Sequence, residues 1–123
     1  MKGDRTNLDI SAEDLALIEK ARSSGARVIT VLLSGRPLIL GKALDRSDAF
    51  VVAWLPGTEG LGVTDVLFGK YQPTGKLPRN WRSNDQLTST MNQPGPGTLQ
   101  FPYGFGSKYW PSRKILLRSD HPV

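Results

Sequence analysis

A helix followed at once by an apolar strand constrains the fold of this chain more than any other feature. Residues 9–35 read DISAEDLALIEKARSSGARVITVLLSG. Ser11 is a good N-cap residue, and Asp14 follows three positions later as a weaker relative of the capping box. Gly25 stands where a helix commonly ends. The unbroken aliphatic and β-branched run at 28–34 is typical of a strand buried on both faces, so the segment predicts an α/β layer.

A second strand and a second helix repeat this pattern. The short apolar LIL at 38–40 and the polar stretch DRSDA at 45–49 lead into another buried-strand candidate, FVVAWL, at 50–55. A turn, PGTEG, follows, and GLGVTDVLFG at 60–69 predicts a short helix that Gly69 ends. We therefore predict an α/β fold with a partial, mostly parallel sheet flanked by helices, an α/β sandwich.

The C-terminal half is predicted to be rich in loops. Most of the 13 Gly and 9 Pro of the 123 residues cluster between 56 and 106, and these residues favour turns over regular elements. The chain offers at most three buried strands, which is few for a free α/β sheet. We expect that the N-terminal part of the domain is missing and that the exposed sheet edge promotes self-association.

Composition excludes several classes of site. The sequence has no Cys, so disulfides, thiolate metal sites and cysteine nucleophiles are excluded, and its one His, His121, is the third residue from the end of the sequence. A His-based triad or metal site is therefore not expected, and we predict neither a metal nor a cofactor. No apolar run approaches the roughly 20 residues that span a bilayer. The first residues lack the apolar core of a signal peptide, and we predict no membrane association.

The net charge of +5 and pI of about 9.8 raise the question of nucleic-acid binding. The basic residues are spread from Lys2 to Arg118, and many have acidic neighbours. The densest basic cluster, near the C-terminus, has no interleaved aromatic residues for base stacking. The sequence favours a solvated, mildly basic surface and no nucleic-acid partner.

The Gly-rich turns do not match phosphate-binding loops. A Walker A loop needs four residues between its glycines and a Ser or Thr after its Lys. Here Gly69 and Gly75 are separated by five residues, and Leu77 follows Lys76. The glycines at 57, 60 and 62 do not fit G-x-G-x-x-G either, so they are interpreted as turn and packing residues.

Carboxylates are the remaining candidates for catalysis, because glycoside hydrolysis uses two of them. Glu59 is the most interesting acid, since it lies in a Gly-flanked turn after a buried strand, where α/β proteins often place functional groups. The favoured structural interpretation is that its side chain caps the following helix or anchors the loop. Asp65, inside the predicted helix, is interpreted as structural.

Aromatic side chains could stack on sugar rings, but aromatics in Pro- and Gly-rich segments more often hold loops onto a core. The core interpretation is favoured for all five candidates. They are Trp54, Trp81, Tyr103, Phe105 and Tyr109.

Three blocks of sequence together resemble the C-terminal α/β-sandwich domain of family 3 glycoside hydrolases, the β-glucosidases and exo-β-glucanases. They are LLSGRPLIL at 32–40, VVAWLPGTEGLGVTDVLFGKYQPTGKLPRNW at 51–81 and FPYGFG at 101–106. On this resemblance we assign residues 1–107 to a partial domain of that family and leave 108–123 as an unassigned basic tail.

The resemblance implies that the catalytic carboxylates lie outside this sequence. Family members are retaining enzymes in which the nucleophilic Asp belongs to an N-terminal barrel domain. In the glucanase-like branch the acid/base Glu precedes a KGD-like segment, which matches Lys2, Gly3 and Asp4 and places that Glu just before Met1. No catalytic residue is therefore assigned here. Lys2, Asp4 and Glu59 are assigned only as residues near the substrate.

The resemblance also assigns a set of structural motif residues. They are Gly35, Arg36, Pro37, Trp54, Pro56, Gly57, Gly60, Gly75 and Pro78.

The sequence thus predicts a fragment of a retaining β-glucosidase or exo-β-glucanase that is inactive alone and needs no cofactor. Its predicted partners are the missing barrel domain and, in the complete enzyme, a β-glucoside or β-glucan. The resemblance implies a periplasmic or secreted parent. The alternative is a non-catalytic carbohydrate-binding or protein-interaction module.

Overall fold

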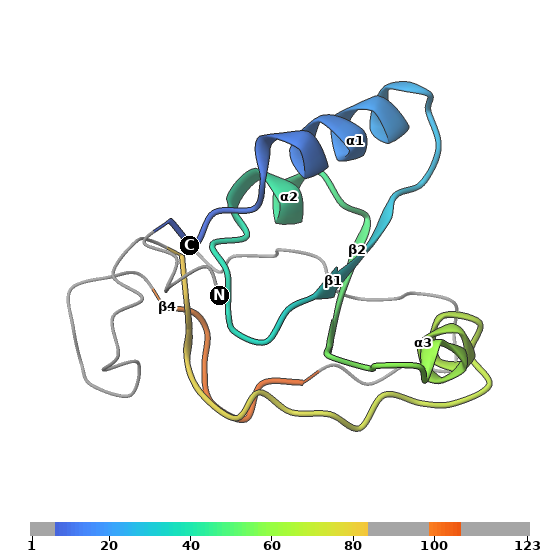
Figure 1. Cartoon of the computed structure of the whole chain (residues 1–123), viewed down its shortest axis with the longest axis vertical. Coiled ribbons are helices and arrows are strands. Elements are labelled where there is room, and N and C mark those ends of the chain that lie inside the picture. Colours follow the sequence, from blue (N-terminus) through green and yellow to red (C-terminus); the bar gives the residue numbers. More distant parts are fainter. Residues whose placement is uncertain (1–6, 84–98, 107–123) are drawn as a thin grey trace.

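The computed structural model describes residues 7–83 and 99–106. Helices and strands alternate from residue 12 to residue 67, and two very short strands follow (Figure 1). In chain order the elements are α1 (Ala12–Ser23), β1 (Ile29–Leu33), α2 (Gly41–Asp45), β2 (Ala49–Trp54), α3 (Gly60–Leu67), β3 (Trp81–Arg82) and β4 (Leu99–Phe101).

Helix α1 begins and ends where the sequence predicts. The Ser11 hydroxyl oxygen accepts the backbone N–H of Asp14 at 3.1 Å and donates to the Asp14 carboxylate at 2.7 Å. These bonds satisfy an N–H group that has no partner inside the helix. At the other end Gly25 has φ +80° and donates its N–H to the carbonyl of Arg22 at 3.0 Å. Glycine adopts this left-handed conformation without a Cβ clash, so it ends the helix.

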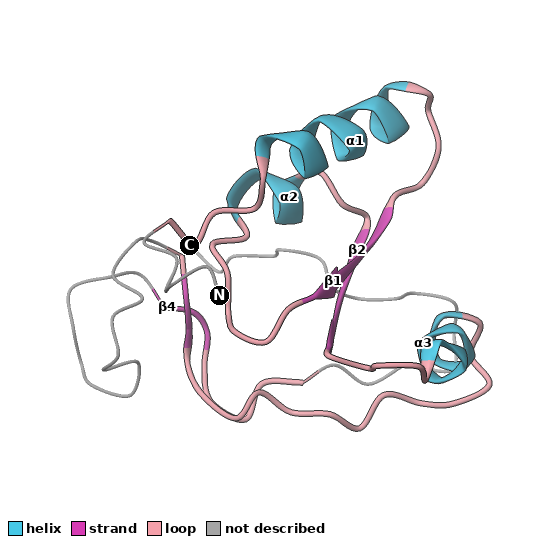
Figure 2. Ribbon diagram, in the orientation of Figure 1, coloured by secondary structure: helices cyan, strands magenta, loops and turns pink. Residues whose placement is uncertain are grey.

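Strands β1 and β2 pair in parallel, which confirms the predicted α/β fold with a small parallel sheet. The pairing runs from Ile29 opposite Ala49 to Leu32 opposite Val52, and then shifts so that Leu33 lies opposite Trp54. Parallel strands need a crossover connection, and here it contains α2. Figure 2 shows α2 beside α1, while α3 lies apart from both.

Helix α2 was not predicted. The region was expected to be a polar connection, but Gly41–Asp45 forms a single helical turn that buries Ala43 completely. So short a segment cannot show a helical period in its sequence, and Gly at its start is a poor helix former. The turn forms because Ala43 fits against the core.

The core is small and lies where α2, β2 and β3 meet. Its buried cluster consists of Leu40, Ala43, Phe50 and Trp81, with Ile10, Leu15 and Ile18 among the partly buried side chains around it. The Trp81 indole N–H donates to the Leu38 carbonyl at 2.8 Å, so this buried ring has its polar group satisfied.

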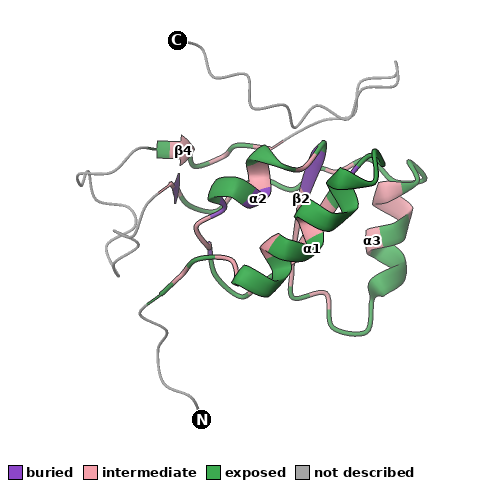
Figure 3. Cartoon of the chain, turned by 90° about the horizontal axis from the view of Figure 1, so that it is seen from above, coloured by how far each residue is buried: buried purple, intermediate pink, exposed green. Residues whose placement is uncertain are grey.

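Strand β1 is less covered than the sequence predicts. Ile29 is 46% exposed and Leu33 59% exposed, so the expectation of a strand buried on both faces is wrong for the described residues. Figure 3 shows little buried surface on the helices: α1 and α3 bury no residue fully. The strand has the predicted apolar side chains, but the described residues do not include enough packed elements to bury both of its faces.

The described residues of the C-terminal half, 62–83 and 99–106, lie mainly in loops after α3, as expected, and they are held by a short antiparallel pairing. Trp81 of β3 lies opposite Phe101 of β4. Next to this pair, the Leu77 N–H donates to the Phe105 carbonyl at 2.8 Å, and Gly104 N–H donates to the Leu77 carbonyl at 2.9 Å. Two sequence blocks that are far apart in the chain therefore form one structural unit.

Candidate functional site

The carboxyl ends of β1 and β2 meet at one edge of the parallel pair, where α/β sheets generally place their ligands. The loop after β1 comprises residues 34–37, and the loop after β2 comprises residues 55–59. The Ser34 N–H donates to the Trp54 carbonyl at 3.0 Å, which ties the starts of the two loops together. We call these two loops the carboxyl edge.

The loop after β1 packs against the loop after β2. The Ser34 hydroxyl donates to the Arg36 carbonyl at 2.7 Å and accepts the Arg36 N–H at 3.3 Å. A Cβ on Gly35 would lie 3.3 Å from Leu55 Cδ1, closer than an ordinary contact, so glycine suits this position. Pro37 is buried. The loop is thus shaped by backbone and packing requirements.

Trp54 has an unusual backbone conformation for a large side chain. Its φ is +54°, and it is the one non-glycine residue with positive φ among the described residues. The conformation coincides with the shift in strand register opposite Leu33. Its ring centroid lies 5.9 Å from that of Trp81, whose side chain is 1% exposed. The core interpretation is confirmed for Trp81, because a buried ring cannot stack on a sugar.

Glu59 occupies the N-cap position of α3, but its side chain makes no capping hydrogen bond, so the predicted capping role is wrong. The turn is closed by backbone groups instead: Glu59 N–H donates to the Pro56 carbonyl at 3.0 Å, and Gly62 N–H donates to the Glu59 carbonyl at 3.0 Å. Gly57, with φ +59°, provides the left-handed residue of this turn. Within the described part of the chain the exposed Glu59 carboxylate has no hydrogen-bond or ion-pair partner.

Several other acids have structural partners. Glu19 pairs with Arg46 at 3.0 Å, and Asp65 pairs with Lys70 at 3.4 Å. The expectation that Asp65 is structural agrees with this ion pair. The Asp14 carboxylate accepts the hydrogen bond from the Ser11 hydroxyl at the start of α1.

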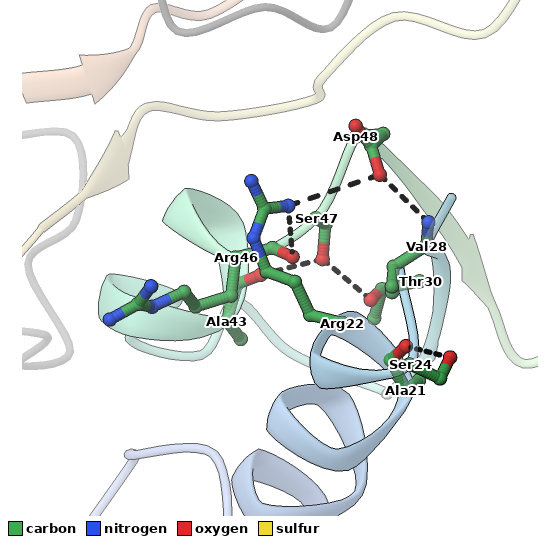
Figure 4. Close-up of polar contacts among 9 residues, drawn as sticks. All are labelled: Ala21, Arg22, Ser24, Val28, Thr30, Ala43, Arg46, Ser47 and Asp48. Atoms are coloured by element: carbon green, nitrogen blue, oxygen red, sulfur yellow. Dashed lines mark hydrogen bonds and ion pairs between the residues drawn. The ribbon is translucent and has the colours of Figure 1, made fainter. Parts of the chain in front are cut away.

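A polar cluster lies at the opposite, amino end of the strand pair (Figure 4). The Asp48 carboxylate accepts the Val28 N–H at 2.8 Å, and Arg22 approaches the same oxygen at 3.9 Å while donating to the Arg46 carbonyl at 3.1 Å. The Ser47 hydroxyl donates to the Ala43 carbonyl at 2.6 Å and contacts the Thr30 hydroxyl at 2.6 Å. These polar groups serve as hydrogen-bond and ion-pair partners for one another, and they link α1 and α2 to the amino ends of both strands. We therefore interpret the cluster as structural.

The remaining motif residues are spread over turns and do not converge on one point. Pro56 accepts the turn hydrogen bond described above, and Gly60 is the first residue of α3. Gly75 lies against Gly106: a Cβ on Gly106 would clash with the Gly75 carbonyl oxygen. Pro78 is exposed. No sequence signal pointed to the Gly75–Gly106 contact, because only the fold brings these glycines together.

Some predicted residues lie outside the described part of the chain. They are Lys2, Asp4, Tyr109, His121 and the tail at 108–123. Among residues 7–83 and 99–106 there is no group of three or more His, Cys, Asp or Glu side chains that could hold a metal ion. In the same ranges, no helix has the length and hydropathy that a transmembrane segment needs.

Comparison with known proteins finds a matching family model and similar proteins. A family model described as the glycosyl hydrolase family 3 C-terminal domain matches residues 2–109. The chain is 38% identical over 111 residues to a periplasmic beta-glucosidase from Salmonella typhimurium, covering 86% of this chain and 14% of that protein. It is 35% identical over 116 residues to a xylan 1,4-beta-xylosidase from Xylanibacter ruminicola, covering 87% and 14%.

The fold matches solved structures of the same kind. An exo-1,3/1,4-beta-glucanase from a Pseudoalteromonas species superposes with a TM-score of 0.74 at 39% identity, over 94% of this chain and 16% of that protein. The chain therefore spans about 14% of the length of the first two curated relatives, and a similar share of this structural neighbour.

Proposed function

Because this chain belongs to the glycosyl hydrolase family 3 C-terminal domain family, we propose that it acts as one domain of a retaining β-glucosidase or exo-β-glucanase. In this role it forms one wall of an active site whose catalytic carboxylates belong to other parts of the enzyme. The reaction is hydrolysis of terminal β-glucosyl units through a covalent glycosyl-enzyme, and it needs no cofactor. The companion that this role requires is a barrel domain carrying the nucleophilic Asp.

The single observation that carries this proposal is the chemistry of the carboxyl edge. Its two loops contain one carboxylate, Glu59, and that carboxylate has no partner within the described residues. Retaining hydrolysis needs two carboxyl groups about 5 Å apart. One carboxylate can contact a substrate or a companion domain, but it cannot act as both nucleophile and acid/base. The chain alone is therefore expected to be inactive.

A complementation experiment tests the proposal. The purified chain is mixed with the Pseudoalteromonas exo-glucanase from which the segment matching this chain has been deleted, and turnover of a chromogenic β-glucoside is measured. We expect no turnover by either protein alone and measurable turnover by the mixture. Turnover by the chain alone, retained in Glu59→Ala, would contradict the proposal that the catalytic groups lie elsewhere.

The same assay examines the residues proposed to lie near the substrate. Glu59→Gln keeps the size of the side chain and removes its charge, so a contact to substrate or companion would lower the restored activity without unfolding the chain. Lys2→Ala and Asp4→Ala are tested in parallel. Glu13→Gln, an exposed acid in the first turn of α1 and outside the two loops of the carboxyl edge, is the matched control and should leave the activity unchanged.

The alternative function, a carbohydrate-binding module, rests on exposed aromatic side chains. Tyr71 is 61% exposed and Tyr103 is 73% exposed. Titration of the chain with cellobiose and laminari-oligosaccharides tests this alternative. Saturable binding that is lost in Tyr103→Ala would favour it over the scaffold role.

We also propose that the chain self-associates in the absence of a companion domain. The described residues bury six apolar side chains, whereas ten large apolar side chains are exposed by more than a third. The parallel pair has only two strands within the same residues, so each strand has a free edge there. Apolar surface and free strand edges both favour association.

A further inference from the structure

We propose that Trp54 is a positioning residue: its backbone conformation and its contact with Trp81 set the place of the Glu59 carboxylate at the carboxyl edge. This inference rests on the proposed function, in which Glu59 contacts the substrate or the companion domain, and it names the residue that holds Glu59 there. Trp54 ends β2, and Glu59 follows five residues later, just before α3. Trp54 acts through Glu59 and is not itself assigned a contact with substrate.

The pairing of β1 with β2 becomes irregular where β2 ends. Leu32 lies opposite Val52 in the regular part. Leu33 then lies opposite Trp54, so the register passes over Ala53. An extra residue of this kind bends a strand and redirects the side chains that follow it, and it occurs often beside active sites. Figure 1 shows the chain turning sharply between β2 and α3, directly after this irregularity.

The backbone of Trp54 is held in a conformation that its residue type disfavours. Its φ of +54° lies in the left-handed region, where the Cβ of a residue other than glycine is crowded by its own backbone. Such residues persist only where the surrounding structure holds them, and they concentrate at functional sites. A chain that only needed to change direction here could use glycine without this cost. The presence of tryptophan therefore points to a requirement for its side chain.

Three contacts hold Trp54 and its neighbour in place. The Trp54 ring lies against the buried ring of Trp81, with centroids 5.9 Å apart and planes tilted by 43°. The Trp54 carbonyl accepts the Ser34 N–H at 3.0 Å. The Leu55 side chain lies close to Gly35, where an added Cβ would be 3.3 Å from Leu55 Cδ1. The end of β2 is thus fixed by the core on one side and by the loop after β1 on the other.

The link from Trp54 to Glu59 is short and has little conformational freedom. The ring of Pro56 fixes its own φ, and Gly57 takes the left-handed conformation at φ +59°. The Glu59 N–H donates to the Pro56 carbonyl at 3.0 Å, which closes the turn. Since the Glu59 side chain makes no capping hydrogen bond, the described residues hold its carboxylate in place through this backbone. A change at Trp54 is therefore passed on to Glu59.

The first arm of the experiment is a double-mutant cycle in the complementation assay. The chain is added at saturating concentration, so that docking does not limit the rate, and kcat/KM is measured for Trp54→Ala, Glu59→Ala and the double variant. We expect Trp54→Ala to lower kcat/KM by about tenfold in the wild-type background and by less than about twofold when Glu59→Ala is already present, because residues that act through one another have non-additive effects. Trp54→Phe keeps an aromatic ring for the contact with Trp81 and should retain most of the activity.

Val52→Ala is the matched control. Val52 also lies in β2 and packs against the core, but it precedes the irregular pairing. Its truncation should lower stability without redirecting the turn, so its effect on kcat/KM should be the same with and without Glu59→Ala. A purely structural role of Trp54 would give this additive behaviour as well.

The second arm examines the turn without any activity, by amide hydrogen exchange followed by NMR. The Glu59 and Gly62 amides report on the turn, because their hydrogen bonds close it, and the Leu15 amide, bonded to the Ser11 carbonyl, reports on α1. Trp54→Ala should speed exchange at the two turn amides by about tenfold relative to Leu15, because it opens the turn locally. Val52→Ala should change all three amides by similar factors.

Each contrary result has a distinct meaning. Exchange at the Glu59 amide that Trp54→Ala leaves unchanged relative to Leu15 overturns the inference, whatever the activities are. A loss of kcat/KM that is equal with and without Glu59→Ala also overturns it, while the proposed function stands because the wild-type chain complements. Failure of the wild-type chain to complement the deleted exo-glucanase overturns the proposed function, and this inference with it.

Discussion

The backbone conformation of Trp54 is one that its residue type does not predict. Tryptophan at φ +54° has its Cβ near the following carbonyl, which costs roughly 1–2 kcal/mol for residues other than glycine. The cost is offset by the contact with Trp81 at 5.9 Å. The conformation changes the direction of the chain at the end of β2, so the turn carrying Glu59 depends on it.

Two substitutions at Trp54 separate backbone strain from side-chain packing. Both Trp54→Gly and Trp54→Ala remove the ring contact and should destabilise the chain. In an ordinary strand glycine is about 0.5–1 kcal/mol less stable than alanine. At positive φ the order should reverse, so we expect Trp54→Gly to be about 1 kcal/mol more stable than Trp54→Ala in urea unfolding followed by circular dichroism. At Val52, in the regular part of β2, the same pair of substitutions should keep the ordinary order. The same order at both positions would show that Trp54 is not strained.

The residue types alone predicted the interactions of some side chains but not those of others. The cap of α1 was predictable because Ser11 and Asp14 act within a few residues of each other, and their bonds depend on local geometry only. Trp81 was correctly interpreted as a core residue. The Glu59 side chain was not predictable, because a capping residue and an exposed carboxylate differ only in rotamer and surroundings. Trp54 was unpredictable because nothing in its residue type favours positive φ.

At the scale of elements, the contact between Gly75 and Gly106 holds the last described segment in place. A Cβ on Gly106 would overlap the Gly75 carbonyl oxygen and also lie 3.3 Å from Lys76 Cγ. The neighbouring bonds between Leu77 and residues 104 and 105 depend on this close approach. The motif glycine at 75 thus has a partner glycine in a different sequence block.

Gly106→Ala is therefore expected to detach the segment 99–106 from the rest of the chain. We expect a loss of about 1–3 kcal/mol, the usual cost of overpacking, together with faster hydrogen exchange at the Leu77 amide. Gly62→Ala is the control, because a Cβ there meets nothing within 4 Å and the position lies inside α3. That variant should be stabilised by about 0.5–1 kcal/mol. Equal effects of the two substitutions would contradict a steric role for Gly106.

The sequence predicted elements well where a local pattern defines them. The helices α1 and α3 and both parallel strands follow from periodicity, caps and glycine stops. Helix α2 was missed because its only strong contact, Ala43 in the core, is a tertiary one. The parallel direction of β1 and β2 was predictable from the intervening chain length and the apolar runs, but the register shift at Leu33 was not.

At the scale of the whole molecule, the described residues share a core that is small for their number. Within residues 7–83 and 99–106 the buried apolar residues are Val28, Leu40, Ala43, Ala49, Phe50 and Trp81, and two of these six are alanines. Each alanine buries little area, and burial stabilises by about 25 cal/mol per Å² of apolar surface. Folding costs conformational entropy for every residue that becomes ordered, and the burial of so few apolar side chains offsets this cost only narrowly. We therefore expect the chain to be only marginally stable alone.

Unfolding of the whole chain should consequently depend on protein concentration. At high dilution we expect a broad urea transition with an m-value near the lower end of the usual range, about 1 kcal/mol per molar, because m scales with the surface exposed on unfolding. As the concentration rises, association stabilises the folded chain by mass action, and the midpoint should move to higher urea. A sharp transition that is independent of concentration would mean that the described core suffices, and the large exposed apolar surface would then need an explanation other than a missing partner.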